Sequence, residues 1–234
     1  MANGRIVVTG ASQGIGEAVA RDLDRRGYQV VCVSRSGRAP VGVARSCDMT
    51  DEDAVKALFA EIGSEGPITG LVNNAGYHAL RSIASMKTQD FEAMLRLNVT
   101  AVMMASREAY PFLRASQGMI VNMGSWFDKM GVRDNIAYCA SKAAVAAMSR
   151  CMAIEWARDG INVLNIGPGY IETDLNRDYL ASEKVKAFLG KRIPVQRPGS
   201  VDEVARLIGA LFSENIKFLT GETIYIDGGQ GIAH

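Results

Sequence analysis

Residues 5–16 read RIVVTGASQGIG and decide the fold class. A short β-branched run predicts a strand, and a helix-compatible segment at 17–26 follows the glycines. Strand, glycine turn and helix are the context of a phosphate-binding loop, because Gly10, Gly14 and Gly16 permit a tight turn while free amides at the helix start attract pyrophosphate. The spacing is GxxxGxG rather than the usual dinucleotide fingerprint GxGxxG, so a purely structural turn stays open as the alternative at this point.

Strand-like and helix-like segments alternate along the rest of the chain. Further strands are expected at 29–33, 43–46, 68–72, 119–123, 161–166 and 223–226, and further helices at 51–62, 88–97, 99–114, 136–158 and 201–212. This alternation predicts an α/β fold, a doubly wound parallel sheet of about seven strands, Rossmann-like, with helices on both faces. We expect one domain, 1–234, in which the polar stretch at about 171–197 is a helical flap over the site.

Composition and charge narrow the classes of protein. The 234 residues suit one large α/β domain, and a formal net charge of +1 without long charge runs gives no indication of nucleic acid or an anionic membrane as partner. Four cysteines without CxxC spacing and two histidines make a disulfide framework or a metal site unexpected. No apolar run reaches the ~18 residues of a membrane span, and the chain enters a strand too early for a signal peptide, so we expect a cytoplasmic protein.

The second expected strand runs into Ser34 and Arg35. In a dinucleotide site an acidic residue here bonds the ribose 2′-hydroxyl, whereas an arginine accommodates a 2′-phosphate. Arg35 without a neighbouring acid therefore favours NADP(H), with NAD(H) still possible; the alternative is that Arg35 is a solvated loop charge. Asp48, after the third expected strand, either accepts a hydrogen bond from the adenine amino group or is simply a turn acid.

Polar residues follow the expected carboxyl ends of several strands, which is where open parallel sheets bind ligands. NNAG at 73–76 contains two asparagines that are costly to bury unbonded, which predicts a network tying neighbouring strands or a ligand together; an ordinary turn is the alternative. Ser125 follows the strand at 119–123, and GPGYIETDL at 167–175 follows another. These segments should therefore meet at one edge of the sheet.

Three further side chains near this edge have two open interpretations each. Trp126 and Phe127 form either an apolar wall for a substrate or ordinary loop packing. Asn98, between two apolar residues of a helical pattern, is expected to face inward and disturb the helix locally, with a satisfied polar core residue as the alternative.

The stretch YCASK at 138–142 lies early in an alanine-rich segment without proline or glycine, which predicts a helix. Residues four apart share a helix face, so the phenol of Tyr138 should lie beside the ammonium of Lys142. A nearby cation lowers the pKa of a phenol, and this predicts an acid–base pair. A surface lysine on an amphipathic helix is the alternative.

Together these motifs resemble the classical short-chain dehydrogenases/reductases over nearly the whole chain. The resemblance rests on TGASQGIG at 9–16, NNAG at 73–76, Asn98, Ser125, YCASK at 138–142, PGYIETDL at 168–175 and YIDGG at 225–229. The glycine motif of that family is GxxxGxG, as here. Several ordered motifs at consistent spacing are far more specific than any one of them.

The resemblance implies a role for each matching position. Tyr138 would be the general acid in carbonyl reduction and the base in alcohol oxidation, while Ser125 would bond the substrate oxygen. Lys142 would hold the nicotinamide ribose and tune Tyr138, and Asn98 would hold a water that relays protons to Lys142. Implied coenzyme contacts are Gly10, Ser12, Gln13, Gly14, Ile15, Gly16, Ser34, Arg35, Asp48, Met49, Asn74, Ala75, Gly76, Tyr138, Lys142, Pro168, Gly169, Ile171 and Thr173. Expected substrate contacts are Ser125, Trp126, Phe127, Tyr138 and Tyr170.

The resemblance also implies an activity and an assembly. The chain is expected to be an NADP(H)-dependent oxidoreductase that reversibly transfers hydride between the nicotinamide and a small-molecule ketone or secondary alcohol. Alternatives are a 3-oxoacyl-thioester reductase, an NAD-dependent catabolic alcohol dehydrogenase and a non-catalytic dinucleotide-binding protein. Many NADP-preferring relatives carry a basic residue where Gln13 stands, so the coenzyme preference depends on Arg35 alone. A homotetramer or dimer is expected through the helix of Tyr138, with Ala143, Ala146 and Ala147 allowing close helix contact.

Overall fold

Seven parallel strands form the central sheet of the computed structural model, which describes residues 3–233. They lie in the order β3-β2-β1-β4-β5-β6-β9. Their bounds are β1 Asn3–Thr9, β2 Tyr28–Ser34, β3 Val43–Ser46, β4 Ile68–Asn73, β5 Met119–Met123, β6 Asn162–Pro168 and β9 Thr223–Ile226. The predicted doubly wound parallel sheet is confirmed. The expected domain 1–234 also includes residues 1, 2 and 234, which lie outside the described residues.

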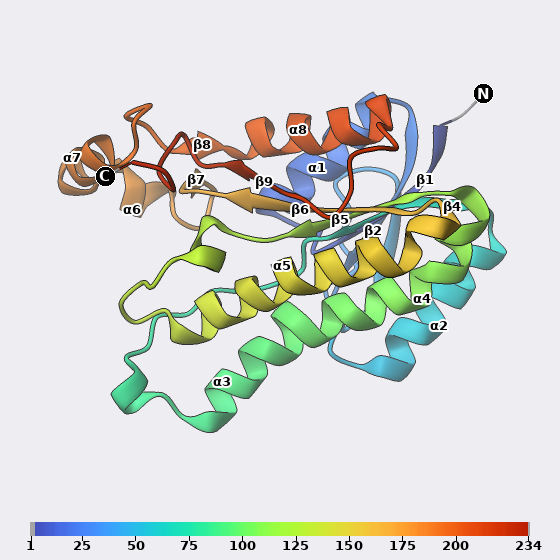
Figure 1. Cartoon of the computed structure of the whole chain (residues 1–234), viewed down its shortest axis with the longest axis horizontal. Helices are drawn as coiled ribbons and strands as arrows, with labels where there is room; N and C mark the ends of the chain where they lie inside the picture. The colour runs from blue at the N-terminus through green and yellow to red at the C-terminus, as the bar shows by residue number, and fades with distance from the viewer. Residues whose placement is uncertain (1–2, 234) are drawn as a thin grey trace.

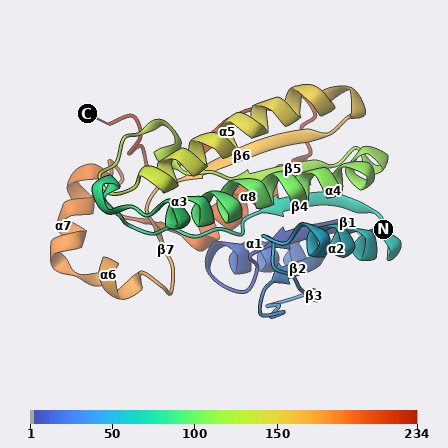
Figure 2. The same cartoon turned by 90° about the horizontal axis from the view of Figure 1, so that it is seen from below.

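Helices cover both faces of this sheet (Figures 1 and 2). The helices α1 (Gly14–Arg25) and α8 (Val201–Glu214) pack together on one face. The opposite face carries α2 (Glu52–Ser64), α3 (Thr88–Leu95), α4 (Ala101–Ser116) and α5 (Ile136–Trp156). Because the strand order reverses between β1 and β4, the loops after these two strands open a crevice at the switch point, where doubly wound sheets bind ligands.

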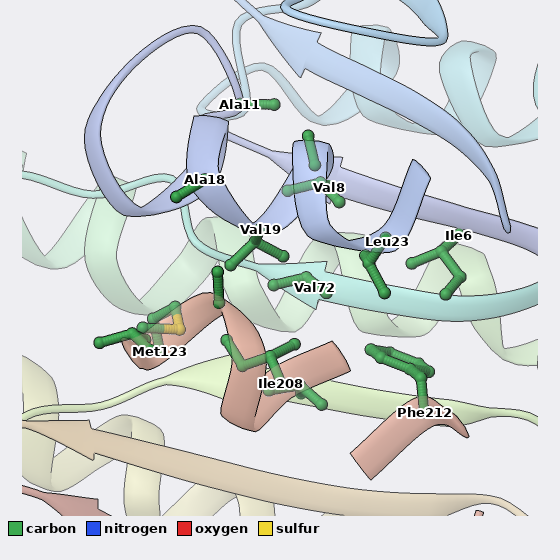
Figure 3. Packing of buried hydrophobic residues seen from close by; sticks show 14 of the residues in the cluster. Ile6, Val8, Ala11, Ala18, Val19, Leu23, Val72, Met123, Ile208 and Phe212 are labelled. Carbon is green, nitrogen blue, oxygen red and sulfur yellow. The ribbon is translucent and has the colours of Figure 1, made fainter. Parts of the chain in front are cut away.

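The core consists of two apolar clusters, one on each face of the sheet. Figure 3 shows Leu23 of α1 and Phe212 of α8 close to Ile6 of β1 in the first cluster. The next strand residue, Val7, belongs to the second cluster, since successive side chains of a strand point to opposite faces. Burial on both faces explains why the parallel strands are continuous apolar runs in the sequence.

Side-chain caps fix the starts of α8 and α2. Helix α8 begins after Ser200 with a capping box, in which Ser200 accepts from the backbone of Glu203 and the Glu203 carboxylate accepts in return. Asp51 rather than Thr50 caps α2, because its side chain accepts from the Ala54 amide. Helix α1 begins at Gly14, three residues before the expected start at 17, and no side chain caps it.

Several short elements were not expected from the sequence. A two-stranded sheet pairs β7 (Ile171–Glu172) with β8 (Gly199–Ser200) and brackets the segment that carries α6 (Arg177–Ala181) and α7 (Glu183–Arg192). Single turns lie at η1 (Ile83–Ser85), η3 (Trp126–Lys129) and η4 (Ala157–Asp159), and η2 (Arg96–Thr100) is a π-helical turn. Figure 1 places α6 and α7 at the end of the sheet towards which β5 and β6 run. Within residues 3–233 no helix is long and apolar enough to cross a membrane.

Candidate active site

The loop after β1 is shaped by glycines that admit no side chain. A Cβ on Gly16 would lie 2.3 Å from the carbonyl oxygen of Gly10, and a Cβ on Gly10 would lie 2.9 Å from Cα of Ala75. Gly14 has a φ of +58°, which L side chains rarely adopt, and a Cβ there would meet Thr173 Cγ2 at an unstrained 3.8 Å. Two glycines therefore allow close backbone packing, and the third opens the uncapped start of α1.

Asn74 ties the loop after β4 to the loop after β1. Its Nδ2 donates to the carbonyl oxygens of Thr9 and Gly10, both at 3.1 Å. In return the Thr9 hydroxyl accepts from the amides of Asn74 and Ala75, at 3.0 and 3.1 Å. The predicted network of the NNAG segment is thus present, and it fixes the two sides of the crevice relative to each other.

Asn73 extends this network into the sheet. Its Nδ2 donates to Asn122 Oδ1 at 2.8 Å and to the Ser106 hydroxyl at 3.0 Å, while Asn122 Nδ2 donates to the Ser149 hydroxyl at 2.8 Å. All four side chains are buried. Because each buried amide is bonded, the network links β4 and β5 to helices α4 and α5 without an unsatisfied donor among these groups.

The end of β2 forms a small polar loop that contains no acidic side chain. The Ser34 hydroxyl donates to the carbonyl oxygen of Arg38 at 3.3 Å, and the Ser46 hydroxyl donates to that of Arg35 at 3.0 Å. The Arg35 side chain is exposed. This arrangement leaves a guanidinium free to meet an anion at the strand end.

Asp48 acts as a turn acid in this structure. Its Oδ1 accepts from the backbone amide of Thr50 at 2.9 Å and from the Thr50 hydroxyl at 2.8 Å. These bonds are the main reason that the pKa of Asp48 is lowered, and the charge of Arg35 adds to the effect. The turn therefore keeps a carboxylate beside the exposed loop of Arg35.

Lys142 lies on α5 one turn after Tyr138 and is buried rather than on the surface. Its Nζ donates to the carbonyl oxygen of Met123 at 2.7 Å and lies 5.5 Å from the ring centroid of Tyr138. Burial lowers the pKa of Lys142 to about 8. The alternative of a surface lysine is therefore wrong for this helix.

Tyr138 differs from the expectation in the direction of its pKa. Burial raises the pKa of Tyr138, while the interaction with the Ser125 hydroxyl lowers it by less. The nearby ammonium bonds the Met123 carbonyl instead of the phenol, so it does not offset the desolvation. A raised pKa keeps the phenol protonated, which is the form that an acid needs.

Ser125 stands at the carboxyl end of β5 as the first residue before the turn η3. Its Oγ accepts from the Phe127 amide at 3.2 Å, and the side chain is buried. A hydroxyl has one donor besides its acceptor sites, so the O–H of Ser125 faces the phenol oxygen of Tyr138 and can be passed to a ligand oxygen bound between them.

Asn98 faces inward from the π-helical turn η2, as expected. Its Oδ1 accepts from the Tyr77 amide at 3.0 Å, and its Nδ2 donates to the Tyr77 carbonyl at 2.9 Å and to the Ser141 hydroxyl at 3.2 Å. Ser141 in turn donates to the carbonyl oxygen of Tyr138 at 2.8 Å. Sequence reasoning missed Ser141, although its place within YCASK is the signal that could have found it.

Aromatic rings form one side of the site. Trp126 lies 4.8 Å from Phe127 and 6.0 Å from Tyr170 between ring centroids, and Phe127 lies 5.9 Å from Tyr138. Trp126 and Phe127 are buried. The structure thus brings together all five residues expected to contact substrate, because Ser125 precedes Trp126 directly. It also adds His78, which the sequence reasoning did not single out, with its ring 4.6 Å from that of Tyr138.

The remaining coenzyme candidates lie around the same edge. Met49 is a buried core residue and Ile15 packs against the core. Gly76 lies close to Asn98, since a Cβ there would be 3.0 Å from Oδ1, and the Thr173 amide donates to Asn176 Oδ1 at 2.7 Å. The other coenzyme candidates lie on the surrounding loops and strand ends; they are Ser12, Gln13, Pro168, Gly169 and Ile171.

The residues of the crevice fit a dinucleotide. An uncapped helix start with an open glycine suits a pyrophosphate, and the acid-free strand end with an exposed arginine suits the ribose side. No group of three or more His, Cys, Asp or Glu side chains that could hold a metal ion occurs in the described part of the chain.

Comparison with known proteins finds the same architecture. The family model described as enoyl-(acyl carrier protein) reductase matches residues 10–230. The 3-oxoacyl-[acyl-carrier-protein] reductase MabA of Mycobacterium tuberculosis is 34% identical over 232 residues, which cover 98% of this chain and 93% of the relative. Glucose 1-dehydrogenase of Gluconobacter oxydans is 34% identical, covering 96% and 91% of the two chains. The structure of a gluconate 5-dehydrogenase from Burkholderia cenocepacia in complex with NADP and tartrate superposes with a TM-score of 0.92 at 29% identity, covering 100% of this chain and 97% of that one.

Proposed function

Because the chain belongs to the short-chain dehydrogenase/reductase family, an NAD(P)-dependent class of oxidoreductases that act on CH–OH or keto groups, we propose that it interconverts a ketone and a secondary alcohol with Tyr138 as its acid–base residue. The observation that carries this proposal is the protonated phenol of Tyr138 next to the Ser125 hydroxyl, at the sheet edge where the glycine loop opens. The names of the relatives differ in substrate, but both describe oxidoreductases.

Each of four residues has one task in the proposed reduction. The Ser125 hydroxyl donates a hydrogen bond to the carbonyl oxygen, and Tyr138 transfers its proton to that oxygen. Lys142 supplies positive charge beneath the phenol as the tyrosinate forms, and Asn98 holds the loop of Tyr77 against α5. When bound, the reduced coenzyme supplies the hydride. In alcohol oxidation the same groups act in reverse, with Tyr138 as base.

For the coenzyme we propose a preference for NADP(H). The glycine loop would hold the pyrophosphate, and the exposed guanidinium of Arg35 would pair with a 2′-phosphate. No acidic residue stands at the end of β2 itself, and the nearby Asp48 carboxylate is bonded to Thr50. The gluconate 5-dehydrogenase structure contains NADP, which supports the proposal. Gln13 adds no charge, so the preference depends on Arg35.

A panel of ketones and secondary alcohols with both coenzymes tests the reaction. The wild-type protein should reduce at least one ketone, and Tyr138→Phe should lower kcat on the order of 10²–10⁴-fold because the proton donor is removed. Coenzyme affinity, measured by fluorescence titration, should stay within a few-fold. Substantial turnover by Tyr138→Phe on the same ketone would exclude Tyr138 as the acid, and coenzyme binding without turnover of any compound would support a sensor instead.

The segment 171–197 is proposed to be a flap over the substrate side. Its helices α6 and α7 pack on a small cluster of Leu180, Leu189 and Ile193, together with Tyr170. That cluster joins the flap to the aromatic side of the site, since Tyr170 also contacts Trp126. A flap of this kind would exclude water from a bound ketone.

We propose that the chain assembles as a homotetramer, or as a dimer, through α5. Ala143 and Ala147 are exposed on that helix and Ile154 is 79% exposed, which leaves a face of small and apolar residues uncovered. Ala146, expected on the same face, is instead buried. A monomer in equilibrium sedimentation at micromolar concentration would refute the assembly.

A cytoplasmic location is proposed from the thiols. All four cysteines are free, and the Cys151 thiol is exposed. Free exposed thiols persist in reducing compartments and tend to oxidise elsewhere. Fractionation of the source cells would test the location.

A further inference from the structure

The imidazole of His78 lies against the ring that carries the acid. The ring centroids of His78 and Tyr138 are 4.6 Å apart with an interplanar angle of 61°, and those of His78 and Phe127 are 6.5 Å apart at 82°. Both are edge-to-face contacts within the range in which aromatic rings attract each other. His78 therefore lies beside the phenol of Tyr138, in the same aromatic cluster as Phe127.

The loop that carries His78 is fixed on both sides of it. Before His78, both backbone groups of Tyr77 are bonded to the Asn98 side chain, at 3.0 and 2.9 Å. After it, the Arg81 amide donates to the carbonyl oxygen of Asp134 at 2.8 Å, which ties the loop to the segment before α5. The imidazole is thus held in place by the same framework that positions Tyr138.

The hydrogen bonds of Asn135 determine which nitrogen of His78 carries a proton. Asn135 Nδ2 donates to the carbonyl oxygen of Arg133 at 2.7 Å, so its Oδ1 is the atom that meets His78 Nε2. An amide oxygen only accepts, and Nε2 is therefore the protonated nitrogen. In the neutral imidazole this makes Nδ1 an acceptor, and no residue within 3–233 donates to it.

His78 is exposed although one of its nitrogens is engaged with the buried Asn135. Its ring packs on Tyr138 and its Nε2 meets Asn135, so Nδ1 is the nitrogen of this exposed side chain that is left to a ligand. A positioned acceptor without a partner selects a ligand that can donate there. When a bound substrate covers the imidazole, an unpaired Nδ1 becomes costly, so the site disfavours an analogue that lacks the donor.

From this juxtaposition we propose that His78 is a specificity-determining residue that accepts a hydrogen bond from a hydroxyl on the carbon next to the reacting carbonyl. The preferred substrates are then α-hydroxy ketones, and the products are vicinal diols; this rests on the proposed function. The atoms and electrons of the reduction balance as they do for a simple ketone. The carbonyl carbon gains hydride from the reduced coenzyme, the oxygen gains the proton of Tyr138, and the neighbouring hydroxyl remains intact while bonded to His78.

The aromatic side of the site complements this assignment. Trp126 and Phe127 present apolar ring surface without charge, and Phe127 contacts both Trp126 and the imidazole. A small hydroxy ketone has a polar edge, formed by its two oxygens, and a carbon edge. The oxygens would face Ser125, Tyr138 and His78, and the carbon edge would face the rings.

The test compares two ketones of the same shape on the wild type and three variants. Acetoin and methyl isopropyl ketone differ only by a hydroxyl in place of a methyl group next to the carbonyl. The wild-type protein should favour acetoin in kcat/KM about tenfold, the upper value for one neutral hydrogen bond. His78→Phe keeps an aromatic ring against Tyr138 but has no acceptor, so the acetoin to methyl isopropyl ketone ratio should fall towards one. The control Leu80→Ala changes an exposed residue of the same loop and should keep the wild-type ratio.

The outcomes separate specificity from simple support of the fold. A fall of kcat/KM by the same factor for both ketones in His78→Phe would mean that His78 only positions Tyr138, and would overturn the proposal. Equal use of both ketones by the wild type would overturn it as well. His78→Gln, which retains an amide acceptor, should restore part of the ratio. Turnover of other ketones but not of acetoin refutes only the substrate assignment, whereas no turnover of any ketone with either coenzyme refutes the proposed function too.

Discussion

Two sides of one sheet edge differ in how they are built. The nucleotide side, formed by the loops after β1, β2 and β4, is made of backbone held by bonds such as those of Asn74. The substrate side, formed by η3, the loop of His78 and the flap at 171–197, is made of side chains that pack on each other. Figure 1 shows both sides along the end where the strands finish.

The supports beneath the two sides differ as well. The glycine loop rests on the large clusters of the sheet, whereas the flap rests on three buried residues, Leu180, Leu189 and Ile193. Local opening depends on how much buried apolar contact a segment has. The nucleotide side should therefore open only with the whole domain, and the flap should open on its own.

Lys142 lies beneath both sides and gives the largest expected effect. Replacing it by Met removes the cation under Tyr138, so kcat should fall on the order of 10²-fold or more, because the tyrosinate is no longer stabilised. Steady-state kinetics on a ketone found by the panel measures this. A Lys142→Met variant with wild-type kcat would show that catalysis on the substrate side does not depend on Lys142.

The same substitution has a pH-dependent effect on stability. The pKa of Lys142 is lowered by burial from 10.5 to about 8, so the folded state releases this proton before the unfolded state does. Below about pH 8 the burial penalty is complete, and between about pH 8 and 10.5 the free energy of unfolding of the wild type should rise relative to Lys142→Met by about 3 kcal/mol. Urea unfolding of both proteins across this window measures the difference. A constant difference would mean that Lys142 is not desolvated.

The next largest difference is expected between two matched glycine substitutions, one on each side of the sheet edge. Gly16→Ala would place a Cβ 2.3 Å from the carbonyl oxygen of Gly10, so the backbone must shift, at a cost of about 1–3 kcal/mol in stability and with weaker coenzyme binding. Gly190→Ala, in α7, has nothing within 4 Å of the new Cβ and should stabilise its helix slightly. Thermal unfolding and coenzyme titration measure both. Similar effects of the two changes would contradict the contrast between packed loop and open flap.

This contrast explains what could be predicted from the sequence. Three features act through the backbone or through neighbours in the chain, and they could therefore be predicted from the sequence. They are the glycine spacing, the NNAG asparagines and the helical spacing of Tyr138 and Lys142. The pKa direction of Tyr138 was wrong because it depends on burial and on the bond of Lys142 to Met123, which only the tertiary structure shows.

The contacts of the substrate side were less visible for the same reason. His78 meets Tyr138 from a loop sixty residues earlier in the chain, and the pairing of β7 with β8 joins two segments of two residues each. Neither short strands nor loop contacts leave a periodic pattern. The helical character of the polar stretch 171–197, in contrast, could be predicted, and the structure places two helices there.

Replacing Arg35 tests the outer end of the nucleotide side, and we expect a smaller effect there than at Lys142 or Gly16. Arg35→Ala removes the expected partner of a 2′-phosphate, and one charge-assisted bond of about 1.5–3 kcal/mol corresponds to about 10–100-fold in affinity for NADPH. The affinity for NADH should change little, so the ratio of the two dissociation constants is the measurement. Arg38→Ala, in the same exposed loop, is the control for a general loss of positive charge. Equal losses for both coenzymes in Arg35→Ala would refute the NADP(H) preference.

The smallest effect is expected from the flap, where Leu189→Ala tests whether the segment opens separately. Leu189 is buried in the three-residue cluster, and its truncation leaves a cavity that loosens α7 against Ile193 and Leu180. Because few contacts join the flap to the sheet, the loss should appear as a several-fold higher KM for the ketone, with faster hydrogen exchange confined to α6 and α7. Leu23→Ala, in the main core beside Phe212, is the matched control and should lower the melting temperature of the whole domain. A fall in global stability with Leu189→Ala as large as with Leu23→Ala would show that flap and sheet unfold as one unit.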